Sequence, residues 1–201
     1  MAALPVTTDA LLPFLAVALA VLVTPGPSLF LIASASLGRG WRAGLVAVAG
    51  TELGIALVTG AVVAGLGTVL ARFGGVLGVL RWLGVAWLAV AGLRALLGPA
   101  PPTTGPTGTG FWAALLVAVL NPSTTPFLLA TLPQFIDPAR PPLPQLATLG
   151  IAFLALATGI DCACAATAAR LAPAWTGSGV RRRATGLLLI GAALLLALAR
   201  A

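Results

Sequence analysis

The chain reads Val23-Thr24-Pro25-Gly26-Pro27-Ser28 in the middle of an apolar run that begins near Ala10 and first meets a positive charge at Arg39. Pro25 and Pro27 have no backbone N–H, and their rings crowd the carbonyls one turn earlier, so an α-helix must open here. In lipid, an open backbone survives only where it faces protein or a water-filled cavity. A half-helix restarting at Pro27 would point its positive N-terminal end into that cavity. The stretch therefore predicts a broken helix beside a site for an anion or a dipolar ligand.

A second break of the same kind lies in the other half of the chain. It reads Leu120-Asn121-Pro122-Ser123-Thr124-Thr125-Pro126, and an apolar stretch from Phe127 to Ile136 follows. Paired interruptions at matching places in two halves are typical of transporters built from inverted repeats. Two independent proline kinks are the simpler interpretation, but the hydroxyl and amide side chains at both breaks favour a binding site. The residues predicted to bind substrate are Thr24, Pro25, Gly26, Pro27, Ser28, Asn121, Pro122, Ser123 and Thr124.

The composition assigns the chain to the membrane. Of 201 residues, 60% are hydrophobic and only 7% are charged, and the mean hydropathy is +1.11. Such a chain has too little polar surface for a soluble globule, so we expect an all-α polytopic protein in a lipid bilayer. All basic residues are Arg; bunched in loops, they would set the topology rather than bind nucleic acid. The run 11–23 has the length of a signal-peptide core, but no basic residue precedes it, so we expect it to be retained.

Six apolar stretches each approach or exceed the ~20 residues that cross a bilayer. The expected spans run from about Ala10 to Leu37, Ala43 to Leu70, Val76 to Leu97, Phe111 to Ile136, Gln145 to Arg170 and Ala184 to Ala199. The fourth span should bend again at Pro133. A Pro/Gly/Thr linker at 98–110 separates residues 1–97 from 111–201. We therefore predict six transmembrane helices arranged as two inverted three-helix repeats, with helices one and four broken.

The arginines predict an orientation. Seven of them fall in or beside the loops after spans one, three and five: Arg39, Arg42, Arg94, Arg170, Arg181, Arg182 and Arg183. The opposite side has four arginines and both acids outside the spans, Asp9 and Asp137. Because positive loops stay in the cytoplasm, both termini are expected outside it.

Two acidic residues fall inside the spans. Glu52 lies in the second span and Asp161 in the fifth, at depths where an acid must be paired, protonated or hydrated. Both belong to the second helix of a repeat, so we expect them to be partners across the repeat axis. Their predicted role is to carry a coupling proton or to bind a substrate ammonium group; a structural acid that fastens two helices together is the alternative.

Cys162 and Cys164 form a C-x-C pattern beside Asp161. They could hold a soft metal ion, but the chain has no His to complete such a site, so packing is the favoured interpretation. Small residues repeat at helical spacing, as at Gly50 and Gly54. Such pairs are typical of close helix packing, either within the bundle or between subunits, so a homodimer is one possible arrangement.

Several motifs together resemble the lysine exporter superfamily, and within it the homoserine, threonine and leucine exporter branch. They are Thr24-Pro25-Gly26-Pro27, Arg39-Gly40-Trp41-Arg42-Ala43-Gly44, Gly84-Val85-Ala86-Trp87-Leu88 to Gly92, and Leu120-Asn121-Pro122 through Leu132-Pro133-Gln134-Phe135. The resemblance covers nearly the whole chain. It implies six spans in two inverted repeats, a plasma-membrane location, and efflux of amino acids or related metabolites by exchange with protons. The family usually has Lys where this chain has Ser123, and Tyr where it has Trp87.

The sequence therefore predicts a secondary transporter that exports amino-acid-like molecules, with no cofactor, no resident metal and no catalytic residues. A heavy-metal exporter using Asp161, Cys162 and Cys164 is one alternative. A non-transporting membrane protein, which would use the breaks only for shape, is another. An enzyme is the least favoured class, because the chain has no nucleophile–His pair, no nucleotide loop and no H-E-x-x-H motif.

Overall fold

The computed structural model describes residues 5–65, 82, 85–86, 88–90, 92–94, 96–97, 108–121, 124–173 and 178–198. Within these ranges the chain forms only helices, turns and short connections, which confirms the prediction of an all-helical protein. The predicted third span, most of the linker at 98–110, and the residues Pro122 and Ser123 lie largely or wholly outside the described ranges.

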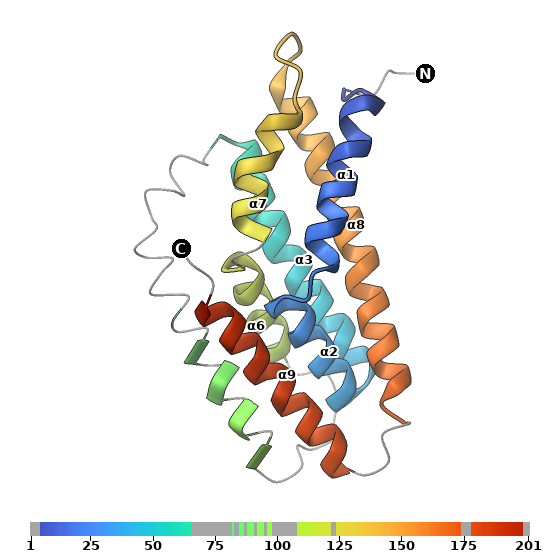
Figure 1. Ribbon diagram of the computed structural model, residues 1–201, viewed down its shortest axis with the longest axis vertical. Coiled ribbons are helices and arrows are strands. Elements are labelled where there is room, and N and C mark those ends of the chain that lie inside the picture. Colours follow the sequence, from blue (N-terminus) through green and yellow to red (C-terminus); the bar gives the residue numbers. More distant parts are fainter. Residues whose placement is uncertain are drawn as a thin grey trace.

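The described helices form one bundle. They are α1 (Thr8–Val23), α2 (Pro27–Arg39), α3 (Trp41–Val63), α6 (Gly108–Val119), α7 (Thr124–Thr131), the 3-10 helix η1 (Leu132–Phe135), α8 (Pro142–Leu171) and α9 (Ser178–Leu198). In Figure 1, α3 and α8 run along most of the length of the bundle, α1 and α7 occupy one half of it, and α2, α6 and α9 occupy the other. The half-helices before and after each break therefore belong to different halves of the bundle.

The described residues support four of the six expected spans. α3 and α8 are each long and apolar enough to cross a membrane. The pairs α1–α2 and α6–α7 qualify when each is taken as one bent span, with bends of 56° and 43°. In α9 the apolar part, Arg183–Leu194, is shorter. Six spans and their inverted symmetry stay a prediction.

Two glycines correct the predicted boundaries of the second span. The predicted turn Gly38–Arg42 is only one residue long: α2 ends at Arg39, Gly40 has φ +83°, and α3 starts at Trp41. The predicted end near Leu70 is wrong, because α3 stops at Val63. Gly65 has φ +76°, and its N–H bonds to the carbonyl of Val62 at 3.0 Å. A left-handed glycine commonly ends a helix in this way.

Small residues let α3 approach its neighbours closely. A Cβ at Gly50 would collide with the backbone of Phe111, and a Cβ at Gly54 would come within 2.7 Å of the Cβ of Ala118. Gly50 and Gly54 therefore pack against α6, as small residues do between membrane helices. A Cβ at Gly60 would meet nothing within 4 Å, so this glycine has no such packing role.

Aromatic rings join the half-helices at one end of the bundle. Phe14 of α1 stacks on Phe127 of α7 with ring centroids 6.4 Å apart, and Phe127 stacks on Phe153 of α8 at 5.6 Å. Phe14 and Phe153 are fully buried. These contacts place Phe127 of α7 between Phe14 of α1 and Phe153 of α8.

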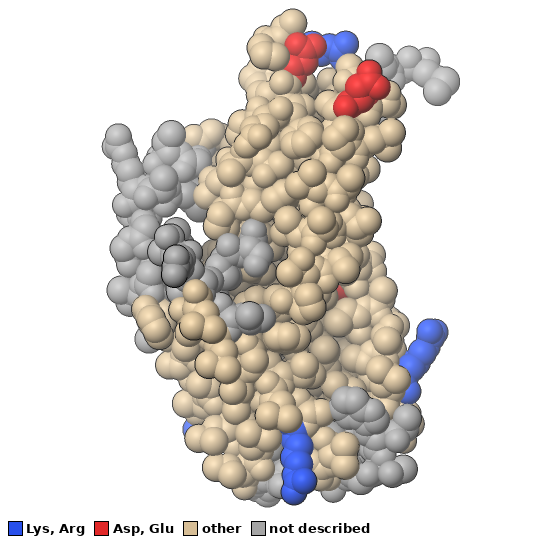
Figure 2. All heavy atoms as spheres, viewed as in Figure 1, with Lys and Arg blue, Asp and Glu red and all other residues tan. Residues whose placement is uncertain are grey.

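The two ends of the bundle differ in charge. Figure 2 shows the acidic side chains at one end beside a small basic patch, and the other basic side chains in view towards the opposite end. The acidic end contains Asp9 at the start of α1 and the exposed ion pair Arg140–Asp137, 3.3 Å between Nε and Oδ2. The buried side chain of Gln145 fastens the adjoining loop by bonding to the N–H and carbonyl of Asp137 and to the carbonyls of Arg140 and Pro141.

Candidate functional site

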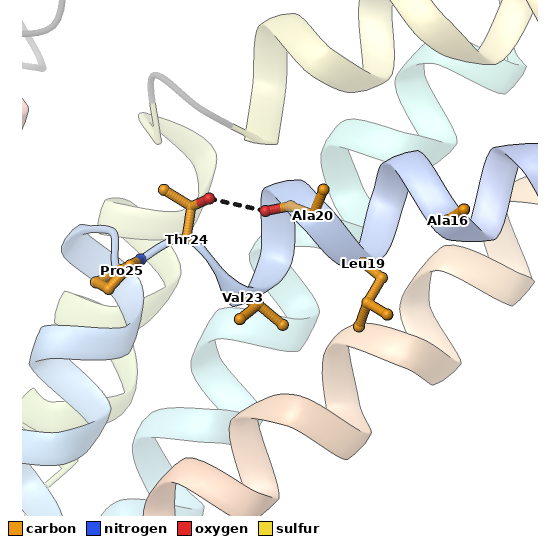
Figure 3. A pocket seen from close by; sticks show the side chains of 6 residues that line it. All are labelled: Ala16, Leu19, Ala20, Val23, Thr24 and Pro25. Atoms are coloured by element: carbon orange, nitrogen blue, oxygen red, sulfur yellow. Dashed lines mark hydrogen bonds between the residues drawn. The ribbon is translucent and has the colours of Figure 1, made fainter.

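The first break has the geometry that its prolines predict. α2 begins at Pro27, and Gly26 before it is extended, with φ −122° and ψ 178°. No side chain caps α2, so its first N–H groups, those of Ser28 and Leu29, have no partner within the helix. On the α1 side, the hydroxyl of Thr24 donates to the carbonyl of Ala20 at 2.7 Å, as Figure 3 shows. The break thus offers free donors on its α2 side and a satisfied carbonyl on its α1 side.

At the second break, the described residues bond to one another across the interruption. The N–H groups of Leu120 and Asn121 bond to the carbonyls of Leu116 and Ala118, so the end of α6 tightens into a turn. The Thr125 hydroxyl then donates to the carbonyl of Val119 at 3.0 Å, across the interruption. Among the described residues of this break, the side chains of Asn121 and Thr124 are buried.

The two breaks are directly bonded to each other. Asn121 Nδ2 donates to Ser28 Oγ at 3.2 Å, although the two residues lie far apart in the sequence. Around this bond is a small cavity of about 30 Å³. The described residues that line it are Val21, Leu22, Thr24, Gly26, Ser28, Leu29, Thr51, Ile55, Asn121, Thr124 and Asp161. At ~10 to 15 Å³ for one water, the cavity has room for one or two waters and not for an amino acid.

Two carboxyl groups meet beside the cavity. Asp161 on α8 lines it and is 5% exposed, and Glu52 on α3 is its electrostatic neighbour. Both carboxyl oxygens of Glu52 are buried without a hydrogen bond of good geometry, although Thr158 and Asp161 are nearby. None of the described residues lining the cavity is basic. Such a pair has no counter-charge from the described lining, so a bound proton or a cation is the natural way to balance it.

The structure brings together most of the predicted binding residues. Thr24, Gly26, Ser28, Asn121, Thr124 and Asp161 line one cavity. Pro27 is buried at the first position of α2 and serves to start that helix. Pro25 instead faces an open hollow of about 540 Å³ on the outer side of the break, lined also by Ala16, Leu19, Ala20, Val23 and Thr24 (Figure 3). Pro122 and Ser123 lie outside the described residues.

Thr51 belongs to the site but was not predicted from the sequence. It lines the cavity, its side chain is fully buried, and its hydroxyl has no hydrogen-bond partner. The only sequence signal is that Thr51 precedes Glu52 on the same helix. A threonine in an apolar span can also bond to its own helix backbone, so residue type alone does not identify it.

The two cysteines contact backbone and apolar groups instead of further metal-binding side chains. Cys164 lies 3.8 Å from the carbonyl oxygen of Leu29, as a weak S–H donor does, and Cys162 packs with an apolar cluster. Within the described ranges no three His, Cys, Asp or Glu side chains gather closely enough to hold a metal ion.

Interrupted helices that meet at a polar cavity are typical of secondary membrane transporters. The comparison with family models agrees: residues 19–200 match the LysE type translocator family, so the chain belongs to this family. The predicted resemblance is thereby confirmed, and the chain is a membrane translocator rather than an enzyme.

Curated relatives span most of the chain. It is 29% identical to an uncharacterized membrane protein of Vibrio cholerae, over 94% of this chain and 97% of the relative. It is 31% identical to the homoserine/homoserine lactone efflux protein of Salmonella typhimurium, over 76% and 77%. It is 28% identical to the leucine efflux protein of the same organism, over 74% and 70%. No solved structure matches the chain.

Proposed function

We propose that this protein exports amino acids or closely related small metabolites across the plasma membrane in exchange for protons. The observation that carries the proposal is the meeting of both helix breaks and Asp161 at one cavity. The efflux names of two relatives support the substrate class.

The chemistry of the cavity fits a zwitterion. The N–H groups of Ser28 and Leu29 at the start of α2 would donate hydrogen bonds to the substrate carboxylate, because a helix N-terminus favours an anion. The ammonium group would lie beside Asp161, with the carboxyl of Glu52 behind it. The aliphatic lining from Val21, Leu22 and Ile55 would contact an apolar part of the substrate.

The carboxyl pair provides the coupling. Glu52 and Asp161 are neighbours, so they bind and release protons as a unit. A proton and a substrate ammonium group would compete for that unit, and the pair would therefore release one when it binds the other. If the protein switches between its inward-facing and outward-facing conformations only with a proton or a substrate bound, the result is exchange across the membrane.

The cavity is too small for an amino acid, so the structure corresponds to a closed conformation in this mechanism. Opening would separate the half-helices on one side and break the bond between Ser28 and Asn121. In the inverted-repeat scheme, residues 1–97 and 111–201 rock against each other about this cavity. The end carrying Arg39, Arg42 and Arg170 would face the cytoplasm, with both termini outside. A homodimer is compatible with this scheme but not required by it.

The test is efflux from proteoliposomes loaded with a panel of labelled amino acids, with and without a pH gradient. We expect some of the amino acids to leave faster when the gradient is imposed. Liposomes loaded in the same way but without the protein should show no such effect. The proposed function would be excluded if every compound left at the rate seen in protein-free liposomes, with or without the gradient.

A further inference from the structure

We infer that the closed cavity is also a binding site for a small monovalent cation, Na⁺. Its polar lining consists of five neutral oxygen-bearing side chains and one carboxyl group: Thr24, Ser28, Thr51, Asn121, Thr124 and Asp161. Hard cations bind through hydroxyl, carbonyl and carboxylate oxygens. The space of about 30 Å³ suits one small ion with at most one water.

The hydrogen bond made by Thr24 leaves its oxygen able to accept a contact from such an ion. The hydroxyl hydrogen of Thr24 is directed to the carbonyl of Ala20, so the remaining polar capacity of this oxygen is as an acceptor. In transporters with broken helices, the C-terminal end of a half-helix likewise supplies oxygens to ions. Here Val21, Leu22 and Thr24, which form the end of α1, all line the cavity.

Thr51 points to a ligand independently of the helix ends. It is fully buried, its Oγ1 lacks a hydrogen bond, and it lines the cavity. A buried hydroxyl without a partner is unfavourable. An ion held between Thr51 and Asp161 would give this oxygen its missing contact.

The charge balance favours a cation with a single charge. α1 ends and α2 begins at the cavity, so the negative end of one helix offsets the positive end of the other. Asp161 then remains as the formal charge among the described lining residues. While Glu52 holds a proton, one Na⁺ would neutralise Asp161, whereas a divalent cation would leave an excess positive charge in apolar surroundings.

This inference goes beyond the proposed function and does not require it, because binding can be measured without transport. The two share Asp161, so Na⁺ and H⁺ would compete for it. The titratable groups near Asp161 are Glu52 on α3 and Cys164 on α8. Raising the pH should therefore strengthen Na⁺ binding until Asp161 is deprotonated.

The experiment measures thermal unfolding of the purified full-length protein in detergent. NaCl, KCl, MgCl₂ and choline chloride are compared at one ionic strength and without substrate. We expect a saturable rise in Tm with Na⁺ only, because a ligand that binds the folded state stabilises it. Asp161→Asn should remove the rise, and Thr51→Val should weaken the apparent affinity about tenfold, roughly the loss of one polar contact.

Thr59→Val is the matched control. Thr59 lies two turns along α3, is buried, and also has a hydroxyl without a partner, but it does not line the cavity. Its variant should keep the Na⁺ affinity of the unmodified protein. Thr51→Ser, which retains the hydroxyl, should keep it too.

Two results would overturn the inference: equal stabilisation by Na⁺, K⁺ and choline, or Na⁺ affinities that do not differ between Thr51→Val and Thr59→Val. If Thr51→Val does not fold, equilibrium binding of ²²Na⁺ to the unmodified protein decides the question. Displacement by NaCl but not by KCl supports the site, and absence of saturable binding excludes it. Neither result depends on whether any amino acid is transported.

Discussion

The break between α1 and α2 and the break between α6 and α7 lie against the same cavity but are built differently. At the first, Gly26 is extended and no side chain caps the N–H groups that open α2, while Gly26, Ser28 and Leu29 line the cavity. At the second, Thr125 bonds back across the interruption to Val119. The side chain of Asn121 then reaches across to Ser28.

We interpret this difference as a division of labour between the two breaks. The first break presents uncapped backbone N–H groups, which favour an anionic group. The second contributes a side chain that holds the halves together while the cavity is closed. Both motifs contain proline for the same reason, but proline only opens the helix; the neighbouring residues decide what the opening presents.

Removing the prolines of the first break should have the largest effect. With Pro25→Ala and Pro27→Ala together, α1 and α2 can join into one helix, and the N–H groups of Ser28 and Leu29 become internal bonds. We expect transport to fall on the order of 100-fold, as misplacement of binding groups can cause, while the protein still inserts. Pro13→Ala, a proline inside α1 far from the break, is the control. Full transport by the double variant would show that the break is only a kink.

The next prediction concerns the acids that both breaks share. Glu52→Gln and Asp161→Asn together keep size and hydrogen-bonding capacity but cannot ionise. Efflux driven by a pH gradient should fall to background, while membrane insertion and the unfolding temperature stay near those of the unmodified protein. Asp137→Asn in the exposed loop should leave efflux intact. Normal gradient-driven efflux by the double variant would assign both acids a structural role.

Cutting the bond between the breaks should have an intermediate effect. Asn121→Ala removes the donor to Ser28, and such a bond is worth roughly 0.5 to 1.5 kcal/mol. We expect the transport rate to change about tenfold at most. Ser28→Ala removes the same bond from its other side, so the double variant should be no worse than Asn121→Ala alone. Additive effects would mean that the two side chains act separately.

The smallest effect should come from removing the hydrogen bond between Thr125 and Val119 at the second break. Thr125→Val removes the bond to Val119 and should lower the free energy of unfolding by about 1 kcal/mol, with transport nearly unchanged. Thr24→Val is the informative comparison, because Thr24 lines the cavity. It should impair transport at a similar cost in stability. Equal transport by the two variants would contradict the proposed difference between the breaks.

The positions of both breaks could be predicted because proline acts locally. The missing N–H of Pro27 costs no hydrogen bond only at the start of a helix, so the sequence identified Pro27 as the first residue of α2. The end of α3 could not be predicted in this way. Glycine is frequent inside membrane helices, and only the backbone angle at Gly65 identifies it as the residue that ends the helix.

The partners within the site required the fold. The bond between Ser28 and Asn121 joins residues from the two halves, and no sequence periodicity sets which hydroxyl meets which amide. Thr51 was missed for a related reason: neighbouring residues on a helix point about 100° apart, so Glu52 does not indicate which side of α3 faces α8. The pairing of Glu52 with Asp161 was accessible, because each lies on the second helix of its half.

The bonds made by Gln145 have a consequence for how long the protein survives in a protease-rich surrounding. Exposed loops with polar residues are the usual sites of cleavage, and a protease must first pull such a segment into an extended form. Here Gln145 bonds to the backbone of Asp137, Arg140 and Pro141, and Pro138 and Pro141 stiffen the same loop. The turn between η1 and α8 should therefore resist proteolytic cleavage, and the chain that joins α7 and η1 to α8 should stay intact.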